Sequence, residues 1–183
     1  MFTFPVLDLD SAPSASKKLL QQTQDNFGFL PNLIGVMATS PALTEAYLTV
    51  AGIFAKSTLT ATEQQIVLLT VSHFHECCYC MAAHTAIASM KNVESDVVNA
   101  IRNNQPIANI KLESLRHFTH LLIKNRGWLN KTDTQAFLDA GYNSQHILDI
   151  LVGISQKMLS NFTNHIAETA LDNEFSEVAW QPA

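Results

Sequence analysis

The sequence has little of what marks several large classes of protein. Glycine is scarce, at 6 of 183 residues, and the alternating pattern of strands is nearly absent, so a β-rich fold is not expected. No stretch approaches the roughly 20 apolar residues that a membrane-spanning helix needs. No basic run is present and the formal net charge is −5, which disfavours nucleic acid as a partner.

The first residues also lack a basic segment followed by an apolar one, so no secretory signal is expected. We therefore expect a cytoplasmic protein that binds neither nucleic acid nor membrane. In a reducing compartment, a closely spaced cysteine pair is more often catalytic than structural.

Apolar residues make up 47% of the chain, and they recur mostly at the three- and four-residue spacing of helices. We expect one all-α domain over 1–183, a compact helical bundle preceded by an extended arm at 1–13. The low charged fraction, 15%, suggests that part of the surface is covered by other subunits. Spacing and capping residues predict helices over 14–27, 32–38, 41–56, 61–75, 76–90, 95–101, 109–124, 132–139 and 144–166.

The last of these helices has a broad apolar stripe. It is expected to face inward, against the helix over 61–75 or the helix over 76–90. Its members are Ile147, Leu148, Leu151, Ile154, Met158, Leu159, Phe162 and Ile166. In the tail that follows, Phe175 and Trp180 are expected to anchor the chain.

All three cysteines lie between His73 and His84, and Cys77 and Cys80 form a C-x-x-C pair. In a helix that begins at about Glu76 or Cys77, the pair and His84 share one face. The two sulfurs could then form an easily reduced disulfide, and the first helical turn would favour a thiolate. His84, one turn further on, could take the proton of Cys80.

Other interpretations compete with a redox pair. Cys77, Cys80 and His84 could form most of a zinc site, with His73 or His75 as the fourth ligand. The cysteines could also be inert and buried, since a free thiol packs like a small apolar group. For Cys78, about 100° round the helix from Cys77, a structural position facing the core is favoured.

The segment Cys77-x-Tyr79-Cys80-x-x-x-His84, preceded by the apolar run from Glu63 to Ser72, resembles a known family. It is similar to the core of the AhpD-like alkylhydroperoxidases, within the carboxymuconolactone decarboxylase superfamily. The match is clear over 61–90. Weaker likeness at Leu30-Pro31-Asn32 and at Ser40-Pro41-Ala42-Leu43 resembles the peroxidase-related branch.

The resemblance implies an all-helical fold, a homo-oligomer (trimer or hexamer) and thiol-based reduction of a hydroperoxide substrate. It implies that Cys80 attacks the peroxide, that Cys77 resolves the product and that His84 moves protons. No bound cofactor is implied: the redox-active disulfide would be restored by an external dithiol or lipoyl-type reductant.

One position departs from the family. A glutamate usually stands twelve residues before the first cysteine, as part of a proton relay, and this chain has Gln65 there. An amide accepts no proton at ordinary pH, so we expect Gln65 to orient His84. Glu63 or Glu76 could replace the missing carboxylate, although Glu63 fits a capping box with Thr60 and Glu76 a helix cap.

The leading hypothesis is therefore a dithiol peroxidase with Cys80, Cys77, His84 and Gln65 in its site. One alternative is a non-redox, decarboxylase-like member of the superfamily. Another is a helical binding protein that responds to redox state without catalysis.

Overall fold

The computed structural model describes residues 3–182, and within them the regular structure is entirely helical. This confirms the predicted all-α class; the part of the predicted arm at residues 1 and 2 lies outside the described range. The elements are α1 Ser14–Phe27, α2 Asn32–Met37, α3 Pro41–Phe54, α4 Ala61–Phe74, α5 Cys78–Met90, α6 Ser95–Arg102, α7 Ile110–Lys124, α8 Lys131–Asp139, α9 Ser144–Ala167 and the 3-10 helix η1 Asn173–Val178. None of the helices in that range is both long and apolar enough to cross a membrane.

Local capping chemistry sets several helix ends where the sequence predicts them. The Ser40 side chain accepts a hydrogen bond from the backbone of Leu43 at the start of α3. Thr60 and Glu63 form the expected capping box at the start of α4. Gly28 ends α1 in the left-handed conformation, with φ +80°.

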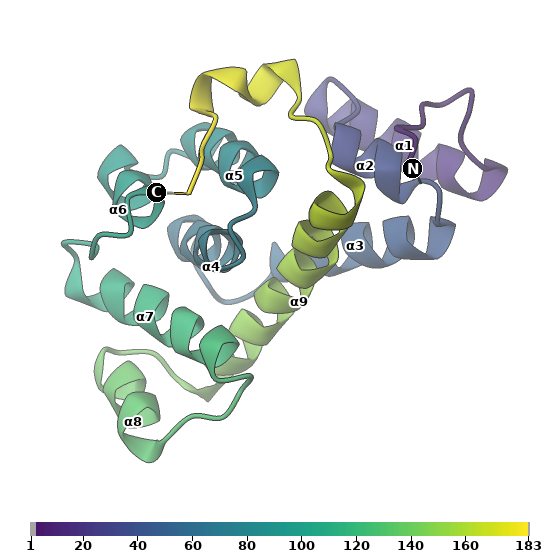
Figure 1. The fold of residues 1–183 in the computed structure, drawn as a ribbon. Coiled ribbons are helices and arrows are strands. Elements are labelled where there is room, and N and C mark those ends of the chain that lie inside the picture. Colours follow the sequence, from purple (N-terminus) through teal and green to yellow (C-terminus); the bar gives the residue numbers. More distant parts are fainter. Residues whose placement is uncertain (1–2, 183) are drawn as a thin grey trace.

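Helix α4 lies at the centre of the bundle, as Figure 1 shows, and packs against α5, α6, α7 and α9. Its residues from Glu63 to Ser72 are all buried, as expected for a helix that is apolar almost all round. The buried apolar residues form two clusters. One cluster surrounds α4, α6 and α7, and the other lies between α1, α2 and α5.

Helix α9 packs against α4 and α5, as predicted, but only part of its apolar stripe, including Ile147 and Ile154, faces the core. Leu148, Leu151, Phe162 and Ile166, expected in the core, are 42–69% exposed. The buried face is mostly polar and includes Gln156, Lys157, Ser160, Asn161 and Asn164. The other members of the stripe leave an exposed apolar surface, and the polar face of α9 forms a wall of the site described below.

Both ends of the described chain fold back onto the bundle. The amino-terminal arm bonds to its own chain, with the Leu7 N–H donating to the Gly35 carbonyl at 3.0 Å. A Cβ at Gly35 would lie 2.7 Å from the Leu7 carbonyl oxygen, so the close approach requires glycine. At the other end Phe175 and Trp180 are buried, which confirms both as anchors.

Candidate active site

The two cysteines of the pair lie at the junction of α4 and α5. Helix α4 ends with Glu76 in the left-handed conformation, φ +54°, and the Cys77 N–H donates to the Ser72 carbonyl at 2.9 Å. This is a Schellman closure, with a glutamate where glycine is usual. Helix α5 begins at Cys78 and Cys77 is its N-cap residue, so the predicted start at Glu76 or Cys77 was early by one or two residues.

Cys80 occupies the third position of α5, within the first turn, and its side chain is 1% exposed. Two groups of α9 contact its sulfur. The Asn164 amide donates to Cys80 Sγ at 3.3 Å and lies 3.7 Å from Cys77 Sγ, and the Ser160 hydroxyl lies 3.7 Å from Cys80 Sγ. Asn164 therefore holds both sulfurs with one side chain.

The electrostatics of the site separate the two thiols. Burial alone would raise the pKa of Cys80, but the Cys77 thiol, the Lys157 charge and Ser160 hold it well below its ordinary value. The pKa of Cys77 is raised, first by its hydrogen bond to Cys80 and then by burial. These shifts favour the thiolate at Cys80 and the thiol at Cys77, while the attacking and resolving roles of the two residues stay a prediction.

Lys157 is the cation of this site, and its side chain is fully buried. Burial would lower the pKa of Lys157, but the neighbouring Cys80 charge, above all, holds it above its ordinary value. The ammonium faces the Cys80 charge, yet no oxygen or nitrogen of residues 3–182 accepts a hydrogen bond from it.

His84 is buried, and its Nδ1 lies 3.0 Å from the Gln65 side-chain oxygen. The predicted contact between Gln65 and His84 is thus confirmed. An amide oxygen only accepts, so Nδ1 carries the hydrogen and Nε2 the lone pair. Burial, with the charges of Lys157 and Lys91, keeps the pKa of His84 well below its ordinary value, so the ring is neutral. The groups that lower the pKa of Cys80 are those named above, and a proton-carrying role for His84 stays a prediction.

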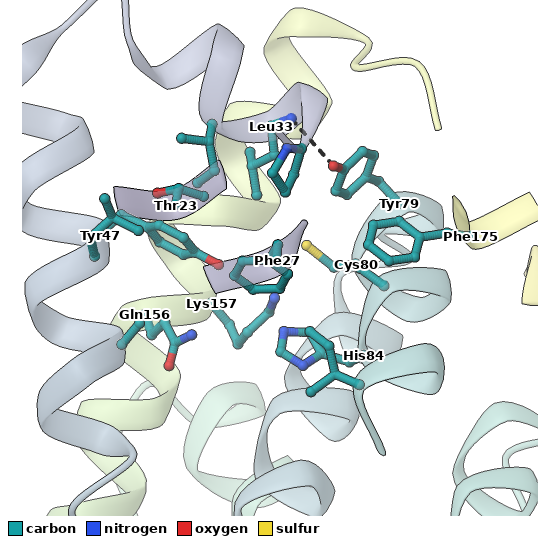
Figure 2. A pocket seen from close by; sticks show the side chains of 16 residues that line it. Thr23, Phe27, Leu33, Tyr47, Tyr79, Cys80, His84, Gln156, Lys157 and Phe175 are labelled. Carbon is teal, nitrogen blue, oxygen red and sulfur yellow. Dashed lines mark hydrogen bonds between the residues drawn. The ribbon is translucent and has the colours of Figure 1, made fainter. Parts of the chain in front are cut away.

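Cys80 and Lys157 line the same cavity, of about 140 Å³. Figure 2 shows the sulfur entering it from α5 and the ammonium from α9, with the Tyr47 hydroxyl also directed inward. Most of the remaining wall is apolar or aromatic. Phe27 also lines the cavity and is 44% exposed.

A buried hydrogen-bond network, called the clasp below, holds the part of the cavity wall next to Tyr79, the residue that directly precedes Cys80. The Tyr79 hydroxyl donates to the Asp172 carboxylate and accepts from the backbone of Leu33. Asp172 also accepts from the backbone of Asn32 at 2.9 Å. The clasp joins α5, the start of α2 and the segment before η1, and Phe175 of η1 packs edge-on against Tyr79.

The other acidic and cysteine candidates lie outside the cavity. Glu63 is engaged by Thr60 and Tyr142, and Glu76 is exposed in the turn before Cys77. Cys78 is partly buried against the core, close to its predicted position, and its thiol contacts the Gln181 side chain. Among residues 3–182, no group of three or more His, Cys, Asp or Glu side chains is placed to hold a metal ion.

The residues that sequence reasoning missed are all on α9 or near it. Lys157 and Asn164 lie about 80 residues from the motif, and the expected orientation of α9 placed them on its outer face. One signal could have found them. The polar residues of α9 recur at helical spacing, and a lysine within such a stripe, in a helix otherwise rich in apolar residues, is unusual. The stripe consists of Gln156, Lys157, Ser160, Asn161 and Asn164.

Comparisons with known proteins agree with the fold and the motif. Residues 41–110 match the Carboxymuconolactone decarboxylase family. A search of curated proteins finds no match to the sequence. Among solved structures, a peroxidase-related protein from Ralstonia eutropha JMP134, described as an alkylhydroperoxidase AhpD core, superposes with a TM-score of 0.84 at 22% identity, covering 94% of this chain and 93% of that chain.

Two further structures are similar at 17% identity and a TM-score of 0.79. One is an uncharacterized peroxidase-related protein from Silicibacter sp. TM1040, with 95% of this chain and 92% of that chain covered. The other is a variant of the debrominase Bmp8 in complex with 2,3,4-tribromopyrrole, with 97% of this chain and 95% of that chain covered. These likenesses establish the AhpD-like fold.

Proposed function

We propose that this chain, which matches the Carboxymuconolactone decarboxylase family over residues 41–110 and has an AhpD-like fold, is a thiol-dependent oxidoreductase that reduces organic hydroperoxides. The observation that carries the proposal is the environment of Cys80. A thiolate stabilised by Cys77, Lys157 and Ser160 lies in the wall of an apolar cavity. A thiolate is the nucleophile of thiol peroxidases, and a protonated buried thiol would be inert.

The proposed cycle uses both sulfurs of the pair. The Cys80 thiolate attacks the distal oxygen of the hydroperoxide, becomes a sulfenic acid and releases an alcohol. The Cys77 thiol then condenses with it, giving a disulfide and water. An external dithiol or lipoyl-type donor reduces the disulfide, and His84, as a neutral base, carries protons between these steps.

The cavity favours substrates with an apolar body. A cavity of about 150 Å³ lined by apolar side chains accommodates a benzene ring, and the volume here is similar. Phe27, Tyr79 and Phe175 supply aromatic surface. Aryl or short alkyl hydroperoxides therefore fit the site better than hydrogen peroxide, which gains nothing from an apolar wall.

Titration of free thiols tests the proposal. Reduced protein should lose two of its three thiols on addition of cumene hydroperoxide, and Cys80→Ser should lose none. Cys77→Ser should stop at a sulfenic acid that dimedone traps. The control Cys78→Ser should react like the wild type, because Cys78 lies outside the cavity. Peroxide consumption by Cys80→Ser at the wild-type rate would refute the assignment and leave the non-redox alternatives.

A second candidate reaction would use the same two electrons, which the Cys77 and Cys80 thiols give up when they form a disulfide. The aromatic walls of the cavity suit a planar ring, and the debrominase that shares the fold was crystallised with a brominated pyrrole. Reductive debromination would convert an aryl bromide and the dithiol into the arene, bromide, a proton and the disulfide. Release of bromide from 2,3,4-tribromopyrrole by the reduced protein would favour this reaction over peroxide reduction.

We also propose that the chain forms a homo-oligomer. The exposed apolar stripe of α9 supports this, because exposed apolar patches of this kind mark protein contacts. Light scattering of the wild type and of Leu148→Glu with Ile166→Glu tests it. A lower mass for the variant is expected, and a monomeric wild type would contradict the proposal.

A further inference from the structure

Lys157 is a buried cation without the partners that such groups normally have. Its side chain is fully buried, and its three N–H donors find no oxygen or nitrogen acceptor among residues 3–182. Buried charges are ordinarily both paired and hydrogen-bonded, because leaving a donor unsatisfied away from water is costly. The ammonium is thus paired with the Cys80 sulfur by charge and by one hydrogen bond, while its other donors stay available.

The available donors point into the reaction space. Lys157 and Cys80 face each other across one cavity, from α9 and from α5 (Figure 2). A small molecule whose oxygen touches the sulfur therefore has its next atom within reach of the ammonium. In a hydroperoxide bound for attack on its distal oxygen, that next atom is the proximal oxygen, which becomes the leaving group.

We propose that Lys157 is the catalytic acid that protonates the leaving oxygen of the substrate, an inference that rests on the hydroperoxide reduction proposed above. In this step a sulfur lone pair of Cys80 forms the S–O bond and the O–O bond breaks. The electron pair of the broken O–O bond goes to the proximal oxygen, which takes a proton from Lys157. The products are Cys80 sulfenic acid, the alcohol and a neutral Lys157 amine; sulfur is oxidised by two electrons and the peroxide is reduced.

The surroundings of Lys157 couple this proton transfer to the consumption of the thiolate. The Cys80 charge is the main contribution that keeps the pKa of Lys157 high against burial. When the thiolate becomes a neutral sulfenic acid, that contribution disappears and burial favours the neutral amine. The proton is therefore released when the leaving alkoxide needs it.

His84 is poorly suited to the same task. The ring is neutral, because burial holds its pKa well below the ordinary value, and its one N–H faces the Gln65 oxygen at 3.0 Å. Lys157 recovers its proton later in the cycle. Reduction of the disulfide by the dithiol donor frees two protons, of which one returns to Cys77 and the other to Lys157.

The charged and titratable groups around Lys157 come from three places in the fold. Cys77, Cys80 and His84 belong to α5 and its cap, Tyr47 to α3, and His75 to the turn after α4. Helix α2, which also packs on α9, contains no titratable residue. The pH dependence of Cys80 alkylation must therefore be compared between variants that differ only at position 157.

The experiment varies the leaving group. Single-turnover oxidation of Cys80 in the reduced full chain is followed by the loss of the free thiols of Cys77 and Cys80, which requires no recycling donor. Cumene hydroperoxide has a strongly basic alkoxide leaving group, whereas meta-chloroperbenzoic acid has a weakly basic carboxylate. Lys157→Met should slow the reaction with cumene hydroperoxide by roughly 10²- to 10³-fold and that with the peracid by about 10-fold or less. Loss of thiolate slows both equally, so the ratio of the two rates isolates the proton transfer.

Two further variants complete the test. Gln156→Met removes a neighbouring polar group of the cavity without removing charge, and it should leave the ratio of the two rates unchanged. Lys157→Arg keeps a cation that does not give up its proton. It should retain iodoacetamide alkylation of Cys80 at pH 6, which Lys157→Met loses, without recovering the rate with cumene hydroperoxide.

Equal slowing of both peroxides in Lys157→Met, or full recovery in Lys157→Arg, would overturn the inference while leaving the proposed function intact. If Lys157→Met does not fold, the Lys157→Arg comparison decides alone. A wild type that reacts with neither peroxide would overturn the proposed function, and the inference with it.

Discussion

Glu63 and Lys157 are both buried charged residues on helices of the same bundle, and their surroundings differ sharply. The Glu63 carboxylate accepts from the Thr60 backbone and hydroxyl at 2.8 Å each and from the Tyr142 hydroxyl at 3.0 Å. Lys111 lies 3.7 Å away. Around Lys157, by contrast, the ammonium, the Gln156 side-chain oxygen and the Asn164 side-chain oxygen have no hydrogen-bond partner among the described residues.

This difference separates a polar network that holds the fold from one that is open to a ligand. A satisfied network contributes stability and leaves nothing to bind. An unsatisfied one costs stability, and proteins keep such sites where activity requires them. Four predictions follow from the comparison, in order of decreasing expected effect.

Glu63→Leu should lower the free energy of unfolding by roughly 2–4 kcal/mol, because it leaves the Tyr142 hydroxyl unpaired in a buried place and removes the capping box with Thr60. Urea denaturation followed by circular dichroism measures the change. Glu45→Leu, on the exposed face of α3, serves as the control and should change stability by less than about 0.5 kcal/mol. If Glu63→Leu lost thiol reactivity but kept its stability, the Glu63 network would not be the structural one, and the comparison would fail.

Asn164→Leu should behave in the opposite way. It removes the amide that donates to both sulfurs, and a hydrogen bond to a charged group is worth about 1.5–3 kcal/mol. Alkylation of Cys80 by iodoacetamide at pH 6 should therefore slow by roughly 10- to 100-fold, while the stability to urea stays the same or rises. A large loss of stability with unchanged alkylation would show that Asn164 is structural.

Gly153→Ala tests the tightly packed part of the buried face of α9. A Cβ there would lie 2.7 Å from Phe54 Cζ and 2.8 Å from Val67 Cγ1, so overpacking should cost about 1–3 kcal/mol of stability. Gly52→Ala is the matched control. Nothing lies within 4 Å of its added Cβ, and helix propensity should make it stabilising by about 0.5–1 kcal/mol. Equal urea midpoints for the two variants would contradict the close approach.

The contribution of Glu63 to the stability of the fold should also depend on pH. Burial alone would raise the pKa of Glu63, but hydrogen bonds from Thr60 and Tyr142 lower it below the ordinary 4.5. A lowered pKa in the folded state means that the ionised form contributes stability above the unfolded-state pKa, and that this contribution is lost as the pH falls through the folded-state pKa.

The stability difference between wild type and Glu63→Leu should therefore be constant from about pH 7 to pH 5 and shrink as the pH falls below about 4. Urea denaturation between pH 3 and pH 7 measures it. A difference that is the same at pH 3 as at pH 7 would show that the carboxylate charge contributes nothing.

Features with local causes were predictable from the sequence. The capping box of Thr60 and Glu63, the Ser40 cap and the end of α1 at Gly28 each depend on residues within a few positions of one another. The contact between His84 and Gln65 was also foreseen, since both belong to the segment over 61–90.

Features that depend on which face of a helix is covered were not predictable. Apolar periodicity marked the correct helix over 144–166 and its packing on α4, but it assigned only part of the inner face correctly, because periodicity identifies an apolar stripe without saying what covers it. Lys157 and Asn164 were missed for that reason. The clasp of Tyr79 with Asp172 joins positions 93 residues apart, and no local signal marks such a pair.

The Schellman closure at Glu76 has a consequence for how the two sulfurs can move. Cys77 serves both as the residue that closes the central helix and as the N-cap residue of the next, so its main chain is tied at both ends. Because the main chain is held in this way, formation of the sulfur–sulfur bond must come from rotation of the two cysteine side chains. The backbone of the cysteine pair is therefore held as rigidly as α4, and each catalytic cycle can proceed without local unfolding.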